Sequence, residues 1–409
     1  MQRRWIVLAA LALIFFFVTA TTFTSLAVVL FTMSAQLHWS MAEAGFSFSL
    51  LGLACGLSSP LPAIAIRLIG ARWTATAGCL LLAAGFLIAS VSHGIGEFFV
   101  AIILMGTAFS LVAPVPGMFL LPRWFPDHAP RIVGVYFMGG SAGGVLGPVL
   151  VNASVSWTHN WRLHWALMAG ASVVLALVCA ALIRDRSESA VVADTARVHG
   201  AAVPGWTTRT AMMSQPFLVT AFAMVVVQTA LTVVNSSMIA HMHLLGGSTS
   251  YGAMGIGLVA LTGTLAKGAA GALTERVHPL HMMLVSLVLG CAAFALFGLS
   301  RSIEMNFLAA ALFGVGWGTA WLSAHLLLLR RFGRVVTPDL VALATTITTI
   351  AVIGPFAAGI VADRTGSFAP IFLIVSALFL VALIPALLLR REPGMTLHPR
   401  VPAVLPVVR

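Results

Sequence analysis

The segment Val145-Leu146-Gly147-Pro148 recurs as Val352-Ile353-Gly354-Pro355, 207 residues further along the chain. A second pair of segments, Ile66-Arg67 and Glu275-Arg276, is separated by 209 residues. Both separations are close to half of the 409 residues of the sequence. Because self-similarity at a fixed spacing is the signature of a repeated structural unit, the sequence predicts two similar halves in the same orientation.

Long apolar runs surround these segments and fill most of the chain. The sequence is 60% hydrophobic and 8% charged, with a mean hydropathy of +1.04, whereas soluble domains carry about 25% charged residues. A helix needs about 20 apolar residues to cross a hydrocarbon core of about 30 Å. The runs predict twelve spans at 6–33, 43–66, 73–91, 97–121, 131–154, 164–183, 215–241, 251–273, 279–299, 303–329, 338–361 and 367–389. The composition excludes a soluble enzyme and predicts an all-α polytopic membrane protein.

One polar stretch divides the twelve spans into two groups of six. We therefore predict an N-terminal six-helix bundle at 1–184, a cytoplasmic linker at 185–214, a C-terminal six-helix bundle at 215–392 and a cytoplasmic tail at 393–409. The first apolar run is too long for the core of a signal peptide, so we interpret it as a retained helix.

The positive charge of the chain indicates its orientation in the membrane. The formal net charge is +11, but the arginines lie at the ends of apolar runs and do not form a nucleic-acid-binding face. With a cytoplasmic N-terminus, eighteen arginines fall on the inner side and three (Arg162, Arg301 and Arg364) on the outer side. The positive-inside rule then places both termini in the cytoplasm, and we expect a bacterial-type inner membrane.

The loop after the second span resembles a motif of the major facilitator superfamily, and the resemblance extends over essentially the whole chain. The superfamily pattern is of the Gly-x-x-x-Asp-Arg-x-Gly type. Arg67, Gly70 and Arg72 match it, with one extra residue between Arg67 and Gly70, while Ile66 occupies the aspartate position. The second-half copy keeps the acid-base pair Glu275-Arg276. The resemblance implies two six-helix bundles and a cytoplasmic latch made by these residues.

Further stretches resemble the monocarboxylate porter and oxalate/formate antiporter branch of that superfamily. They are Leu37-His38-Trp39-Ser40, Trp124-Phe125 followed by Arg131, the glycine-rich segment 139–148, and Lys267 followed by Gly271. The acid that animal monocarboxylate porters pair with the cation of span eight falls at Gly263, and span eleven has no lysine like that of oxalate exchangers. This resemblance implies transport of a small organic anion.

Lys267 is the only lysine of the sequence and lies well inside span eight. A charged group in the membrane needs a partner or a water-filled cavity, so Lys267 is a candidate anchor for a substrate carboxylate. The alternative is that its side chain extends toward the membrane surface near Glu275, eight residues away.

Polar side chains in three other spans predict a cavity between the bundles. Gln228, Thr232 and Asn235 share one face of span seven, and further groups are Thr345, Thr348 and Thr349 in span eleven and Thr21, Thr22, Thr24 and Ser25 in span one. Of these we take Gln228, Asn235, Thr345, Thr349 and Thr22 as candidate substrate-binding residues. Ordinary contacts between helices, or hydrogen bonds of the threonines to their own helix, are the alternative.

Span ten carries two tryptophans away from the membrane surface. Trp317 and Trp321 are one helical turn apart, so they are candidates for an aromatic platform that contacts substrate or covers a cation. The alternative is tight packing beside Gly314, Gly316 and Gly318.

Glycines of span five predict close packing with another helix. Gly139, Gly143 and Gly147 share one face, which we expect to contact span eight across the interface between the halves. Pro148 and Pro355 are expected to bend spans five and eleven at equivalent places. His241 and His243, at the outer end of span seven, are expected to be exposed loop residues.

Together these features predict a secondary active transporter of a small organic anion, most simply a monocarboxylate, working by alternating access. An exporter of amphipathic compounds is the alternative within the class, and a membrane sensor or enzyme is the alternative outside it. No motif for ATP hydrolysis, metal binding or covalent catalysis occurs in the sequence, so we expect no catalytic residues, no metal and no cofactor. The expected partners are the anion, membrane lipid and a proton as candidate coupling ion, with no nucleic acid, and we expect a monomer.

Overall fold

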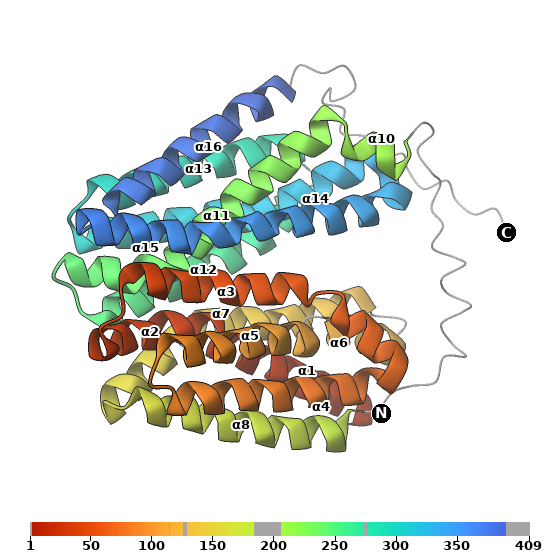
Figure 1. Ribbon diagram of the computed structural model, residues 1–409. Coiled ribbons are helices and arrows are strands. Elements are labelled where there is room, and N and C mark those ends of the chain that lie inside the picture. Colours follow the sequence, from red (N-terminus) through yellow and green to blue (C-terminus); the bar gives the residue numbers. More distant parts are fainter. Residues whose placement is uncertain (1, 114, 126–128, 184–205, 274–275, 390–409) are drawn as a thin grey trace.

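The computed structural model describes residues 2–113, 115–125, 129–183, 206–273 and 276–389. Within these ranges the secondary structure is helical and contains no strand. The helices form two groups, one from each half of the chain, which lie against each other (Figure 1). The predicted all-α fold with two bundles is therefore confirmed.

The helices follow the predicted spans closely. The first half contains α1 (Gln2–Thr21), α2 (Phe23–Leu37), α3 (Met41–Leu57), α4 (Leu61–Val91), α5 (Ile95–Val112), α6 (Val115–Trp124), α7 (Ala129–Thr158) and α8 (Trp161–Leu182). The second half contains α10 (Thr208–Met212), α11 (Gln215–Leu244), α12 (Thr249–Leu273), α13 (Pro279–Leu299), α14 (Ile303–Ile347), the 3-10 helix η3 (Thr348–Val352), α15 (Ile353–Thr365) and α16 (Ala369–Leu389). Eleven helical segments of the described chain are long and apolar enough to cross a membrane.

The second predicted span is divided between two helices. Helix α3 alone is too short to be counted as a span, but the first arm of α4 continues it from Leu61 to the turn at Gly70. Gly70 has φ of 82°, a left-handed conformation that a side chain would strain, so the chain reverses there before the third span. The expectation of twelve crossings holds when α3 and this arm are taken together.

Part of the predicted linker packs on the second half. The side-chain hydroxyl of Thr208 on α10 donates a hydrogen bond of 2.9 Å to Asp339, and Trp206 packs edge-on against Phe332. Residues 184–205 of the linker, the tail after Leu389 and Glu275 lie outside the described residues.

The two halves meet along two antiparallel helix pairs. Helix α3 packs on α15, which we call the first seam, and α7 packs on α12, which we call the second seam. In the first seam Gly45 lies against Pro355 and Gly56 against Thr349. In the second seam, a Cβ added at Gly144 would lie 3.6 Å from the Cβ of Ala260. We call the end of the molecule where α3 begins and α15 ends the Asp363 end, and the opposite end the Arg67 end. The halves diverge toward the Arg67 end (Figure 1).

Pro355 lies just after an interruption of its span. A proline lacks the amide that would bond to the carbonyl four residues earlier, which here belongs to Ala351. The hydroxyl of Thr232 on α11 donates a hydrogen bond of 3.1 Å to this carbonyl, and the preceding turn is the 3-10 helix η3. Helix α7 instead runs without interruption through Pro148. The two prolines therefore lie at equivalent places in different local structures.

Candidate functional site

Lys267 on α12 and Trp317 on α14 form the centre of the candidate site. The ammonium nitrogen of Lys267 lies 3.8 Å from the centroid of the Trp317 ring. A cation over the face of an indole is attracted by the ring quadrupole. Among the described residues, no carboxylate forms an ion pair with Lys267, so the ring face is its electrostatic partner.

Glycines on both helices create the space that the Trp317 ring fills. A Cβ at Gly318 would overlap the carbonyl oxygen of Gly263, so the two backbones touch at this level. A Cβ at Gly263 would lie 2.5 Å from the Trp317 ring. The ring therefore occupies the volume that any side chain at position 263 would need, an acid included. Packing beside glycines and contact with the cation are both present, so the two sequence-based alternatives for Trp317 are compatible.

The side chain of Lys267 points toward the middle of its helix. The ring that it contacts lies against Gly263, one helical turn farther from Glu275 than Lys267 itself. A lysine that reached for the membrane surface would extend in the opposite direction. The indole nitrogen of Trp317 is buried and has no hydrogen-bond partner in the described part of the chain. One ammonium group and one unused N–H donor thus lie close together.

Helix α12 presents Lys267 on the side that faces the other half. Ala260 contacts Gly144 of α7, and Thr264 and Lys267 follow Ala260 at four and seven residues, on the same helix face. The hydroxyl of Thr264 is bonded to the Ala260 carbonyl, so it offers no free donor. Beyond the contact at Ala260, a Cβ at Gly271 would meet no described atom of the other half within 4 Å.

Helix α11 contributes two amide side chains that the sequence predicted. Gln228 and Asn235 are half-buried, and no hydrogen bond of either side chain is found within the described residues. Thr232, between them, bonds to η3 of its own half. The two amides thus keep donors and acceptors for other partners, whereas Thr232 has a structural role.

Two of the three candidate threonines bond to a nearby carbonyl of their own chain segment, and the third contacts the other half. Thr22 is 1% exposed and donates a hydrogen bond of 2.7 Å to the carbonyl of Val18, at the point where α1 ends, so its hydroxyl is not open to a ligand in this conformation. Thr345 is exposed but bonds to Val341 of its own helix, and Thr349 lies against Gly56 of α3. Thr349 is therefore part of the first seam.

Trp321 lies apart from the cation. It borders a small apolar cavity inside the second half, together with Met224 and Met283. Its ring packs on that of His325, whose Nδ1 is 2.6 Å from the Trp321 carbonyl. The structure therefore brings Trp317 and not Trp321 to Lys267.

The glycine strip of α7 contacts a different helix from the expected one. A Cβ at Gly143 would overlap the carbonyl oxygen of Phe16, and one at Gly147 would lie 2.6 Å from the hydroxyl of Thr24. The strip therefore packs on α1 and α2 inside the first half, and the expected contact with span eight is wrong for Gly143 and Gly147. Neighbouring residues of α7, Gly144 and Val145, approach α12 instead.

The predicted latch residues do not join the halves in this conformation. Arg67 is exposed and donates to the carbonyl of Ala63 on its own helix, and the guanidinium of Arg72 lies over the ring of Trp73. Arg276 is exposed, and Glu275 lies outside the described residues. No ion pair across the Arg67 end is found in the described ranges, in agreement with the divergence of the halves there.

A contact at the opposite end was missed by the sequence analysis. The two carboxylate oxygens of Asp363, at the end of α15, accept hydrogen bonds of 2.8 Å each from the backbone N–H groups of Met41 and Ala42 at the start of α3. The signal was present, because the segment from Gly359 to Gly366 reads Gly-x-x-x-Asp-Arg-x-Gly.

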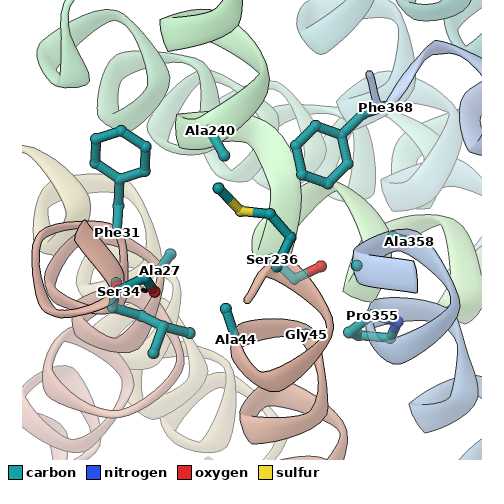
Figure 2. Close-up of a pocket in the computed structure, with 13 residues that line it drawn as sticks. Ala27, Phe31, Ser34, Ala44, Gly45, Ser236, Ala240, Pro355, Ala358 and Phe368 are labelled. Carbon is teal, nitrogen blue, oxygen red and sulfur yellow. Dashed lines mark hydrogen bonds between the residues drawn. The ribbon is translucent and has the colours of Figure 1, made fainter. Parts of the chain in front are cut away.

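A cavity next to this contact lies between the halves and is lined mainly by apolar groups. It has about 420 Å³ of empty space, a volume that includes open solvent. Phe31, Ser34, Ser236 and Phe368 are among the residues around it (Figure 2). The hydroxyls of both serines bond to their own helices. The cavity contains none of the predicted substrate-binding residues and belongs to the closed Asp363 end.

An all-helical chain whose two halves form packed bundles of membrane-length helices has the architecture of a class of membrane transporters. Residues 11–352 match the Major Facilitator Superfamily, and the chain belongs to that family. The chain is also 30% identical over 132 residues to the uncharacterized transporter ESBP6 of Saccharomyces cerevisiae, which is 32% of this chain and 20% of that protein. It thus spans only about a fifth of that relative's length.

Solved transporters share the fold at low sequence identity. The nucleoside transporter NupG superposes with a TM-score of 0.78 at 14% identity over 96% of this chain and 100% of that chain. A bacterial homolog of the human lysosomal transporter Spinster, in an inward-facing and occupied conformation, gives 0.77 at 14% identity over 96% and 97%. These likenesses show the fold alone. The role in transport rests on the family match over residues 11–352.

Proposed function

We propose that the protein is a secondary active transporter that moves a small organic anion, in the first place a monocarboxylate, by alternating access. The observation that carries this proposal is the position of Lys267, whose ammonium group has a tryptophan face, and no carboxylate of the described residues, as its partner. A buried cation without a counter-charge is costly, and a bound anion would supply that charge. A single cation suits a substrate with one carboxylate.

The surroundings of Lys267 support a substrate with an apolar part. The register that pairs Gly144 with Ala260 brings Lys267 level with Phe137 and Met138 of α7. Both side chains are exposed, Phe137 by 38% and Met138 by 66%. The site then combines one cation, the free indole N–H of Trp317 and an apolar wall on the opposite half.

The arginine distribution supports a cytoplasmic position of the Arg67 end. The conformation would then be inward-facing, because the halves touch at the Asp363 end and diverge at the Arg67 end. We propose an inner-membrane location with both termini in the cytoplasm. Single cysteines at Ser187 and Ser248 in a cysteine-free background test it, since labelling of both from the same side of the membrane would contradict the topology.

Counterflow into proteoliposomes that contain the purified protein tests the substrate class. A panel of radiolabelled monocarboxylates, dicarboxylates, nucleosides and cationic amphiphiles should show exchange of the monocarboxylates. Exchange of a neutral nucleoside alone, with no carboxylate transported, would overturn the proposal. Repeating the uptake with an imposed pH gradient tests the proton as the coupling ion.

The variant Lys267→Gln tests the role of the cation directly. It removes the charge and keeps a polar side chain, so the substrate that counterflow identifies should raise the melting temperature of the wild type far more than that of the variant. Lys267→Arg should restore part of the shift, because it keeps the charge but changes the donor geometry. Equal ligand-induced shifts in the wild type and Lys267→Gln would exclude Lys267 as the anchor.

Export of amphipathic compounds is the second candidate. It is favoured by the apolar cavity of Figure 2, which lies between the halves and is bordered by the rings of Phe31 and Phe368. This function predicts exchange of the cationic amphiphiles in the same panel and no dependence on Lys267.

A further inference from the structure

We infer that Asp363 is the clasp that holds the Asp363 end closed, and that the segment Gly359–Gly366 forms this clasp as a unit. The inference rests on the alternating access proposed above but not on the identity of the substrate. Its basis is a pair of hydrogen bonds between elements of the two halves, which have to separate when this end opens.

The start of α3 shows why it needs a partner from outside its own half. The Ser40 hydroxyl accepts a hydrogen bond from the backbone N–H of Glu43, and the Glu43 carboxylate accepts one from the backbone N–H of Ser40. This capping box leaves the N–H groups of Met41 and Ala42 without a partner in α3, because the first amides of a helix have no carbonyl to bond to. Asp363 accepts from both of these groups.

Charge adds to the two hydrogen bonds. The N-terminus of a helix carries a partial positive charge, so a carboxylate there is stabilised beyond the hydrogen bonds that it accepts. Glu43 is the acid that α3 itself supplies in its first turn, and Asp363 is the acid that the other half supplies. Only the second acid is lost when the halves separate.

Three of the four fixed residues of the segment, Gly359, Asp363 and Gly366, have a defined role in this contact. A Cβ at Gly359 would overlap the carbonyl oxygen of Met41, so only glycine lets α15 approach the start of α3. Asp363 follows one helical turn later and reaches the free amides. Gly366 has φ of 66° and ends α15 in a left-handed cap directly after the clasp.

The related segment after span two, which ends near Gly70, lacks the acid that makes the clasp. Ile66, which precedes Arg67 as Asp363 precedes Arg364, is buried, and Arg67 bonds to its own helix. The acid of the pattern is thus present at the Asp363 end and absent after span two. We infer that this chain closes the Asp363 end with a charged clasp and lacks the equivalent clasp after span two.

Cysteine accessibility tests the inference without any substrate. In a variant lacking Cys55, Cys79, Cys179 and Cys291, Ser236→Cys reports on the cavity at the Asp363 end. Thr345→Cys reports on the opposite side, because Thr345 is exposed one turn beyond the contact of Thr349 with Gly56. Labelling rates of both cysteines with a maleimide are measured on purified protein in lipid nanodiscs.

The measured quantity is the ratio of the labelling rate at Ser236→Cys to that at Thr345→Cys. Asp363→Ala should raise this ratio by about fivefold, as expected for losing a charge at a helix N-terminus. Asp363→Asn, which keeps one acceptor oxygen, should give a smaller increase, and it decides the question if the alanine variant does not fold. Glu43→Ala is the matched control, because it removes a cap of the same helix inside one half and should leave the ratio unchanged.

Equal ratios for the Asp363 variants and Glu43→Ala would overturn the clasp. A failure of carboxylate counterflow would instead overturn the proposed substrate and leave the labelling result standing. The two proposals can therefore fail separately.

Discussion

Each of the two seams between the halves is an antiparallel helix pair, but the two pairs differ in how closely their helices pack. In the first seam, backbone meets backbone, since a Cβ at Gly45 or Gly359 would overlap a carbonyl oxygen of the other half. In the second seam a Cβ at Gly257 would lie 2.9 Å from the carbonyl oxygen of Val145, and one at Gly144 would make an ordinary contact. The long glycine strip of α7 packs inside the first half, and of the two seams the first is the closer one. A small-residue strip thus indicates close approach without saying which helix approaches.

The largest effect is expected from Gly359→Ala in the first seam. The added methyl group overlaps the backbone of α3, which cannot rotate away as a side chain can, so the Asp363 end should no longer close. Overpacking of this kind costs ~1–3 kcal/mol, and the transport rate should fall at least about tenfold. Counterflow per unit of folded protein measures it, and a rate near that of the wild type would show that the seam has slack.

A smaller effect is expected from Gly257→Ala in the second seam. The methyl group comes within 2.9 Å of the Val145 carbonyl oxygen, so α12 has to shift by a few tenths of an ångström. We expect a transport rate reduced by about threefold, between those of the wild type and Gly359→Ala. A loss as large as that of Gly359→Ala would mean that the two seams are equally tight.

Thr232→Val tests the interruption that sets α15 apart from α7. It removes the donor to the Ala351 carbonyl and keeps the shape of the side chain. A hydrogen bond of this kind contributes about 1 kcal/mol, so the melting temperature in detergent should fall by a few degrees. An unchanged melting temperature would indicate that this carbonyl finds another partner.

The smallest effect is expected from Gly144→Ala. The added Cβ would be 3.6 Å from the Cβ of Ala260, which is an ordinary packing distance. Transport rate and melting temperature should both equal those of the wild type within error. A strong loss of transport would show that the second seam tightens in another state of the cycle.

The helices of the fold could be predicted from the sequence because apolar runs of membrane length have few alternative structures. The ends were less predictable, and His241 shows why. It was expected in an exposed loop, but α11 continues to Leu244, and His241 is 4% exposed and hydrogen-bonded to Asn306 at 3.0 Å. A polar residue at the end of an apolar run can bond to a polar residue of another helix, and a single run does not reveal that partner.

The candidate site was predictable in part. Lys267 could be identified because a lone lysine in an apolar span is costly. Its contact with Trp317 depends on how α12 packs on α14, which only the structure shows. The helix on which the strip of Gly143 packs could not be predicted, because the same spacing suits any neighbour. Asp363 could have been found by comparing every copy of one short pattern, since the acid missing at Ile66 is present in span eleven.

The ring of Trp317 over Gly263 makes two positions of the chain dependent on each other during evolution. An ancestor with an acid at position 263 could not also hold a tryptophan at 317 in this arrangement, so the two residues have to change together. Among related sequences, an acid at the first position should occur with a small residue at the second. In this protein, Gly263→Asp alone should be poorly tolerated, and Trp317→Ala in the same chain should rescue it.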